Sequence, residues 1–222
     1  METKVLGICG SPIKGGNSEV FLREGLRAIE GVQGVSTELI SLSGKEIRDC
    51  LHCNWCLRKQ EEGRFCNQQD DMTEIFPKLV EADAILLATP VYFRRLSGYM
   101  ACFIDRLRAF VHGNYYGGRL SNKVGGALAI SWVRDAGAET ALLTLMFAFS
   151  TLGILPVFPR PGLGAIGLSS EGGTGKFNPK ERLGVLKDKD GLAQSRVLAE
   201  NAVEMARLIK AGNEALREGL IK

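Results

Sequence analysis

Short runs of apolar and β-branched residues alternate along this chain with longer segments in which apolar residues recur every three or four positions. The short runs predict strands and the longer segments predict helices, because side chains alternate on a strand and repeat about every 3.6 residues around a helix. The predicted strands cover residues 4–9, 35–42, 84–89, 124–130 and 154–158. The predicted helices cover residues 18–30, 72–81, 97–111, 138–151 and 192–217.

This alternation of strands and helices predicts an α/β fold, with a parallel sheet and helices on both of its faces. In such sheets ligands bind at the carboxyl ends of the strands, where the strand order reverses. The loops after the first, third and fourth strands are therefore the candidate ligand site.

Two stretches are longer than ordinary connections in a compact domain. Residues 44–71 hold four of the six cysteines, and residues 160–191 are rich in Gly, Pro, Ser and charge, as expected of a mobile surface excursion. A length of 222 residues is within the range of one large α/β unit. We therefore expect a single domain over residues 1–222, with a cysteine-rich insert at 44–71 and a Gly/Pro-rich excursion at 160–191.

Composition and charge narrow the functional classes. A hydrophobic content of 45% excludes a disordered chain, and a net charge of +3 is too small to indicate a nucleic-acid surface. No apolar run approaches the roughly 20 residues of a membrane span, and the first residues do not resemble a secretory signal. We expect a cytoplasmic protein that binds neither nucleic acid nor membrane.

The loop after the first predicted strand, Gly10-Ser-Pro-Ile-Lys-Gly-Gly-Asn-Ser18, has the composition of a phosphate site. The N–H groups and positive dipole end of the following helix, with Ser11, Asn17 and Ser18 as side-chain donors, can bind a dianion. A nucleoside-triphosphate loop would need Lys where Gly16 stands, which excludes the ATPase alternative. The alternative for this loop is a simple helix cap with Ser18 as the N-cap residue.

A dinucleotide fingerprint, G-x-G-x-x-G, occurs only at residues 162–167, where it follows the fifth predicted strand and does not open a helix. We interpret it as a chance match. The first loop offers one phosphate cradle without that fingerprint, so the sequence favours a mononucleotide over a dinucleotide.

The cysteine-rich insert carries a tight repeat, Cys50-x2-Cys53-x2-Cys56, followed by Cys66. This repeat is typical of a ferredoxin-type ligand set, with Cys66 as the fourth ligand of a [4Fe–4S] cluster. Free thiols, a zinc site and a disulfide are the alternatives. Cys9 and Cys102 fall in a predicted strand and helix, where core packing explains them.

The first loop, the Ala88-Thr-Pro-Val-Tyr-Phe93 turn, the Phe103-Ile-Asp-Arg106 segment and the cysteines together resemble the iron–sulfur flavoprotein branch of the flavodoxin-like, NAD(P)H-dependent FMN reductase superfamily. The resemblance runs from residue 4 to about residue 158. It implies a doubly wound, five-stranded parallel sheet of order 2-1-3-4-5, bound FMN and a homodimer or homotetramer. The nine residues between Cys56 and Cys66 are more than the compact cysteine motif of that family has.

The resemblance also assigns cofactor contacts. The FMN phosphate would lie on Ser11, Pro12, Lys14, Gly16, Asn17 and Ser18. The isoalloxazine would lie along Pro90, Val91, Tyr92 and Phe93, and Tyr92 or Phe93 would pack on the ring unless these aromatics are only lids on the core. After the fourth strand it assigns Ser131, Trp132 and Gly137, although Trp132 stands where small residues are expected and could equally form a dimer contact.

The function that this resemblance implies is an FMN-dependent oxidoreductase. Its FMN and [4Fe–4S] cluster would couple a one-electron donor such as ferredoxin to acceptors, and no catalytic side chain is required because the cofactors carry the chemistry. The alternatives are a cluster-free NAD(P)H-dependent FMN or quinone reductase and a flavodoxin-like carrier, which the positive net charge disfavours. His112 is interpreted as a cap or surface residue. Asp105 either pairs with Arg108 on a helix surface or acts near the cofactors.

Overall fold

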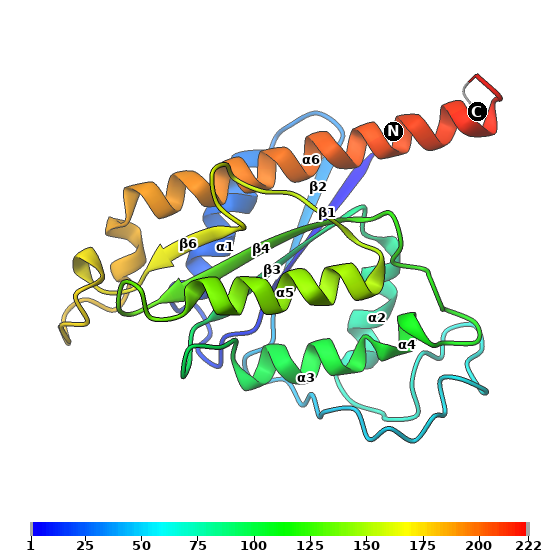
Figure 1. Cartoon of the computed structure of the whole chain (residues 1–222), viewed down its shortest axis with the longest axis horizontal. Coiled ribbons are helices and arrows are strands. Elements are labelled where there is room, and N and C mark those ends of the chain that lie inside the picture. The colour runs from blue at the N-terminus through cyan, green and yellow to red at the C-terminus, as the bar shows by residue number, and fades with distance from the viewer. Residues whose placement is uncertain (1, 221–222) are drawn as a thin grey trace.

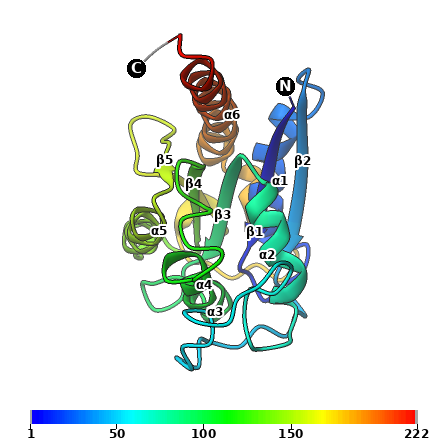
Figure 2. The same cartoon turned by 90° about the vertical axis from the view of Figure 1, so that its right-hand side faces the viewer.

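The sheet is parallel and its strands follow the predicted order. The computed structural model describes residues 2–220, in which β1 (Thr3–Cys9), β2 (Val35–Ser41), β3 (Ala84–Pro90) and β4 (Val124–Ser131) lie in the order β2-β1-β3-β4. Two short strands, β5 (Leu155–Pro156) and β6 (Ala165–Leu168), both pair with β4 and share the fifth position (β6 is labelled in Figure 1 and β5 in Figure 2). The order 2-1-3-4-5 is confirmed, while the fifth strand is shorter than the predicted 154–158.

Helices cover both faces of the sheet, as predicted. On one face α1 (Asn17–Ile29) and α6 (Lys189–Arg217) pack on alternate strand residues such as Leu86. On the other face lie α2 (Met72–Glu81), α3 (Gly98–Arg106), α4 (Arg108–Val111) and α5 (Ala138–Leu152), which enclose residues such as Leu87 (Figure 2). Every residue of β3 and β4 is buried, because a parallel strand covered on both faces contacts no water.

Part of the Gly/Pro-rich excursion at residues 160–191 joins the sheet. It contains β6 and two 3-10 turns, η1 (Glu171–Gly173) and η2 (Gly184–Lys187). Ala165 and Val185 are fully buried against the α1 and α6 face. The G-x-G-x-x-G match leads into β6 and opens no helix. Residues 165–168 therefore belong to the sheet, while most of residues 171–183 lie at the surface.

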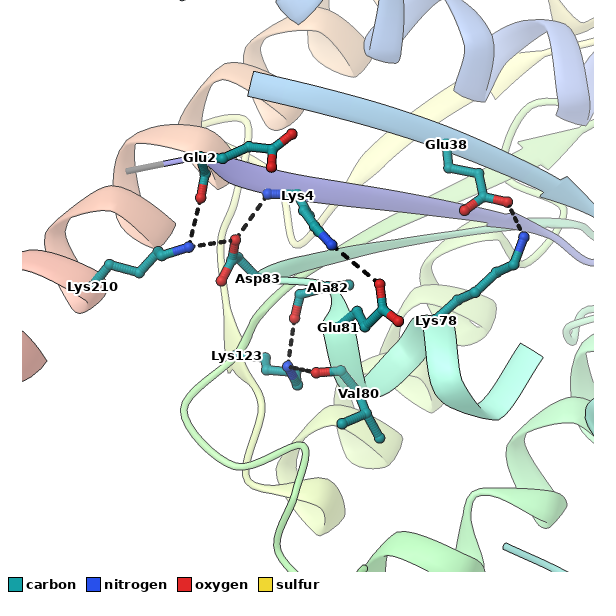
Figure 3. Close-up of polar contacts among 10 residues, drawn as sticks. All are labelled: Glu2, Lys4, Glu38, Lys78, Val80, Glu81, Ala82, Asp83, Lys123 and Lys210. Atoms are coloured by element: carbon teal, nitrogen blue, oxygen red, sulfur yellow. Dashed lines mark hydrogen bonds and ion pairs between the residues drawn. The ribbon is translucent and has the colours of Figure 1, made fainter. Parts of the chain in front are cut away.

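Ion pairs and hydrogen bonds fasten the amino ends of the strands, at the end of the sheet away from the predicted ligand loops (Figure 3). Lys210 of α6 lies 2.9 Å from the Asp83 carboxylate, and Lys4 of β1 lies 3.1 Å from Glu81 of α2. The ammonium group of Lys123 donates to the carbonyl oxygens of Val80, at 2.8 Å, and Ala82. Burial is the main cause that lowers the pKa of Lys123, and nearby Lys210 also lowers it, against the opposing effect of Asp83. These contacts tie α2 and α6 to the sheet.

The cysteine-rich insert passes beside α3 and α4, on the side of the molecule away from α6 (Figure 1 and Figure 2). The predicted helix 97–111 is interrupted at Leu107, where α3 gives way to α4. Among residues 2–220, none of the helices combines the length and the apolarity needed to cross a membrane.

Candidate cofactor site

Three loops meet at the carboxyl ends of β1, β3 and β4, where the strand order reverses. The N–H of Gly10 donates to the Ala88 carbonyl at 2.8 Å, and the N–H of Val91 donates to the Ile130 carbonyl at 2.9 Å. The buried Ser97 hydroxyl donates to the Gly10 carbonyl and caps α3 by accepting from the Met100 N–H at 3.1 Å. These bonds join the predicted flavin turn to the predicted phosphate loop.

The N-terminus of α1 is open for an anion. Its N-cap residue is Gly16, and no side chain of residues 2–220 caps it by a hydrogen bond. Ser18 is the second residue of the helix, so the alternative in which Ser18 is the N-cap residue is wrong. The first N–H groups of a helix have no partner within the helix, and at the positive end of the dipole they favour a phosphate.

Two polar side chains in the first turn of α1 have partners that the sequence did not reveal. The Asn17 amide donates to the Arg182 carbonyl at 3.2 Å and accepts from the Val185 N–H at 3.0 Å, so this side chain is occupied by the Gly/Pro-rich excursion. Glu19 is buried, accepts from the Gly15 N–H at 3.0 Å and pairs with Arg23 at 2.8 Å. Burial raises the pKa of Glu19, but these hydrogen bonds lower it more, so the carboxylate stays charged.

The turn after β3 exposes its aromatic side chains. Phe93 is 98% exposed and has a positive φ of 49°, and Tyr92 is 41% exposed. The N–H of Tyr92 donates to the Arg95 carbonyl at 2.9 Å and closes the turn. Phe93 is therefore no lid on the core, which excludes that alternative for it. Trp132 on the next loop is 50% exposed, and an aromatic surface of this kind suits a flavin ring or a second subunit.

The loop after β4 is fitted against the flavin turn. Gly137 has a φ of 97°, and a Cβ atom there would lie 2.6 Å from the Arg94 Cα. Only glycine allows both this left-handed backbone and this approach. The buried Ser131 hydroxyl donates to the Val133 carbonyl, so it shapes the loop from within.

The four cysteines of the insert are free thiols. Cys9 in β1 and Cys102 in α3 are also free thiols. Cys56 is buried and Cys53 is exposed. Burial is the main cause that raises the pKa of the Cys56 thiol; nearby Arg108 lowers this pKa, and Cys66 and Cys50 raise it. Within residues 2–220 no three His, Cys, Asp or Glu side chains form a group that could hold a metal ion.

A buried glutamine holds the middle of the insert. The Gln60 amide donates to the carbonyls of Phe65 at 2.8 Å and Ala109 at 3.0 Å, and accepts from the N–H groups of Tyr115 and Tyr116. The Gly63 N–H donates to the Tyr116 hydroxyl at 2.7 Å. The segment at 61–63 is therefore a hydrogen-bonded turn.

A buried ion pair holds the end of the insert. The Arg106 guanidinium forms a bidentate pair with the Asp70 carboxylate, and their side chains are 1% and 0% exposed. It also donates to the Arg48 carbonyl at 3.2 Å, while its Nε–H is buried with no partner among the described residues. Burial lowers the pKa of Arg106, but Asp70 and the nearby Cys66 thiol raise it more, so its charge is secure.

Arg108 faces the cysteines and not Asp105. Its Nη1 lies 3.7 Å from the Cys56 Sγ, and its Nη2 donates to the Asn54 Oδ1 at 2.7 Å. No ion pair joins it to Asp105 within residues 2–220, which corrects that alternative. Burial, followed by the charge of Asp49, raises the pKa of Asp105. A cavity of about 420 Å³ beside Arg108 is lined by residues that include Cys50, His52 and His112.

The residues at the three loops suit FMN in their chemistry, and those of the insert suit an iron–sulfur cluster. The uncapped helix behind a glycine loop fits the phosphate of FMN, and the exposed aromatics fit its ring. Four free thiols, one of which lies 3.7 Å from the Arg108 guanidinium group, fit an anionic iron–sulfur cluster in their chemistry.

Comparison with known sequences identifies the family. The family model described as NADPH-dependent FMN reductase matches residues 3–160. An iron-sulfur flavoprotein of Methanocaldococcus jannaschii is 37% identical over 93% of this chain and 99% of its own length. One of Archaeoglobus fulgidus is 33% identical over 93% of this chain and 97% of its own length.

Solved structures agree in fold. The structure of RosB with a bound 8-demethyl-8-formylriboflavin-5'-phosphate superposes with a TM-score of 0.70 at 18% identity, covering 98% of this chain and 87% of RosB. An NADH:FMN oxidoreductase in its apo form gives 0.60 at 19% identity, covering 93% and 89%. The match to the family model and the identity to full-length relatives go beyond fold. This chain therefore belongs to the NADPH-dependent FMN reductase family, in its iron–sulfur flavoprotein branch, and is a flavin-dependent oxidoreductase.

Proposed function

We propose that this protein binds FMN at the three-loop site and a [4Fe–4S] cluster on Cys50, Cys53, Cys56 and Cys66, and moves electrons between a ferredoxin-like one-electron donor and its acceptors. The observation that carries the flavin part is the α1 N-terminus, which lies behind a glycine loop and lacks a side-chain cap within the described residues. Bound FMN exchanges one or two electrons and a cluster exchanges one, so the two together would join one-electron to two-electron chemistry.

The chain itself binds and orients the flavin in this proposal. The backbone N–H groups of residues 17–19 and the hydroxyls of Ser11 and Ser18 would hold the phosphate, with Lys14 at the rim. Residues 90–93 would lie along one edge of the ring, and Ser131, Trp132 and Gly137 would complete the pocket. Because the Asn17 amide is already bonded to residues 182 and 185, its backbone N–H is the part left for the phosphate.

The flavin proposal is tested by identifying the released cofactor and by capping the helix. Mass spectrometry should find FMN, and stoichiometric FAD would contradict our interpretation of the first loop. In Gly16→Asp a carboxylate would compete for the open N–H groups, and the new Cβ would lie 3.0 Å from the Ile13 side chain and 3.1 Å from the Ile13 carbonyl oxygen, so the turn at Ile13 must shift slightly to accept it. We expect FMN binding to weaken by about tenfold or more. Gly212→Asp, which adds the same charge where a Cβ meets open space, should bind FMN normally.

The cluster proposal is tested by iron content after anaerobic reconstitution. Cys56→Ala should lose iron and keep FMN, because the loops that would hold the flavin come from other parts of the sheet. Cys102→Ala, at a free cysteine in α3, should keep both. Equal iron in the wild type and Cys56→Ala, or negligible iron in all three proteins, would contradict the proposal of a cluster.

The second candidate is a cluster-free NAD(P)H-dependent FMN or quinone reductase. The absence of a three-ligand metal group in residues 2–220 favours it. Anaerobic addition of iron and sulfide should then leave the visible spectrum as that of flavin alone, whereas a cluster adds broad absorption. A carrier without catalytic activity would show no rapid NAD(P)H turnover.

The exposed aromatics also support the homodimer or homotetramer expected from the sequence. Phe93, Tyr92 and Trp132 present apolar surface at the mouth of the site, where a second copy would cover both them and the flavin. A monomer mass in light scattering with full activity would contradict this.

The cytoplasmic location stays a prediction, which fractionation of the source cells would test.

A further inference from the structure

At the junction between α3 and α4, the guanidinium group of Arg108 contacts the cysteine repeat. Arg108 is the first residue of α4, and its Nη1 lies 3.7 Å from the Cys56 Sγ. Its Nη2 donates to the Asn54 side chain at 2.7 Å, and Asn54 has a positive φ of 59°. One side chain thus contacts both a thiol and the turn between Cys53 and Cys56.

The charge of Arg108 is not neutralised by a neighbouring acid. Within the part of the chain that the structure describes, no carboxylate forms an ion pair with it, whereas Arg106 two residues earlier is paired with Asp70. Arg108 is half-buried, so water screens its charge less than that of a surface arginine. A positive charge held in this way favours an anionic neighbour.

A cavity supplies a second, independent observation. The space of about 420 Å³ beside Arg108 is bounded by Cys50 and by apolar residues such as Leu107 and Val111. Arg108 therefore adjoins two of the three cysteines of the repeat, Cys56 by direct contact and Cys50 across the cavity.

We propose that Arg108 is a positioning residue for the iron–sulfur cluster, holding the Cys50–Cys56 repeat through Asn54 and Cys56 and stabilising the reduced form with its charge. This inference rests on the cluster part of the proposed function. Four thiolate ligands give a [4Fe–4S] centre a net negative charge, and one-electron reduction adds one further negative charge. A cation and an N–H donor to a ligating sulfur therefore raise the reduction potential.

The test compares four anaerobically reconstituted proteins: the wild type, Arg108→Gln, Arg108→Lys and Arg58→Gln. Arg58 is an exposed arginine two residues after Cys56, so its variant removes the same charge beside the repeat without removing a contact to sulfur. Iron per FMN is measured first. The midpoint potential of the cluster is then measured by a redox titration followed by electron paramagnetic resonance.

We expect Arg108→Gln to shift the cluster potential to more negative values, Arg108→Lys to lie between it and the wild type, and Arg58→Gln to match the wild type. Loss of iron with retained FMN in Arg108→Gln, and recovery of iron in Arg108→Lys, would also support the proposal. Equal iron and equal potentials in all four proteins would overturn it and leave the cluster intact. A wild type without iron would overturn both the cluster and the role of Arg108.

Discussion

The buried pair of Arg106 and Asp70 gives the sharpest prediction about stability. In Asp70→Asn the carboxylate charge disappears while the shape of the side chain is kept. The guanidinium then retains the Arg48 carbonyl as a partner, but it loses its bidentate counter-charge in a place that water does not reach. The exposures of 1% and 0% mean that solvent cannot compensate for the loss.

The expected magnitude follows from this burial. Removing one partner of a buried ion pair leaves an uncompensated charge and costs about 3–5 kcal/mol. The Nε–H of Arg106 already lacks a partner within residues 2–220, so no spare hydrogen bond offsets the change. The double variant Asp70→Asn/Arg106→Met removes the stranded charge and should recover most of the loss.

Urea denaturation with FMN at a fixed excess measures these differences, because a bound cofactor itself stabilises the folded state. The matched control is Glu81→Gln, which removes the carboxylate of an ion pair with 48% and 62% exposed side chains. Its denaturation midpoint should equal that of the wild type. If Asp70→Asn also denatures at the wild-type midpoint, or if the double variant is no more stable than the single one, our electrostatic reasoning about this pair is wrong.

Two further predictions concern β1 and the loop after it. In Gly10→Ala the new Cβ would lie 2.7 Å from the Met100 Cβ, so the loop must move away from α3 and FMN binding should weaken about tenfold, whereas Gly98→Ala meets open space and should titrate with FMN like the wild type. Burial raises the pKa of Cys9 to about 12 from 9.0, so alkylation at pH 8 of the protein without reconstituted iron, followed by mass spectrometry, should label the exposed Cys53 and spare Cys9. Because the folded state keeps this proton longer than the unfolded state, stability from Cys9 is lost as pH rises from 9 to 12, and Cys9→Ala should flatten that part of the pH–stability curve.

Periodicity predicted most of the fold because helices and buried strands carry strong repeating patterns. The helix at residues 72–81 was predicted to the residue, and the strand order followed from the resemblance. The fifth strand was less predictable, since its residues pair only where β4 runs beside them. The chain leaves the sheet after Pro156 and returns at Ala165, and no local pattern announces that return.

The candidate site was predictable in composition but not in bonding. Glycines and hydroxyls before a helix indicated the phosphate loop, yet the partners of Asn17 lie 165 and 168 residues away. Gln60 was overlooked because a glutamine among charged residues gives no signal of burial. Its carbonyl and N–H partners come mostly from residues about 50 positions further along, and only the folded chain brings them together.

The bond between Asn17 and the turn at residues 182–185 bears on what counts as a minimal unit of this family. The family model ends at residue 160, which invites the view that everything beyond it is an appendage. In this chain, however, the first turn of α1 is braced by residues that lie outside that boundary. A fragment cut at residue 160 would keep every predicted contact to the phosphate and still lose the brace that fixes the loop. The boundary of the family model is thus not the boundary of the proposed phosphate site, and transplanting that site into another scaffold would require the late segment as well.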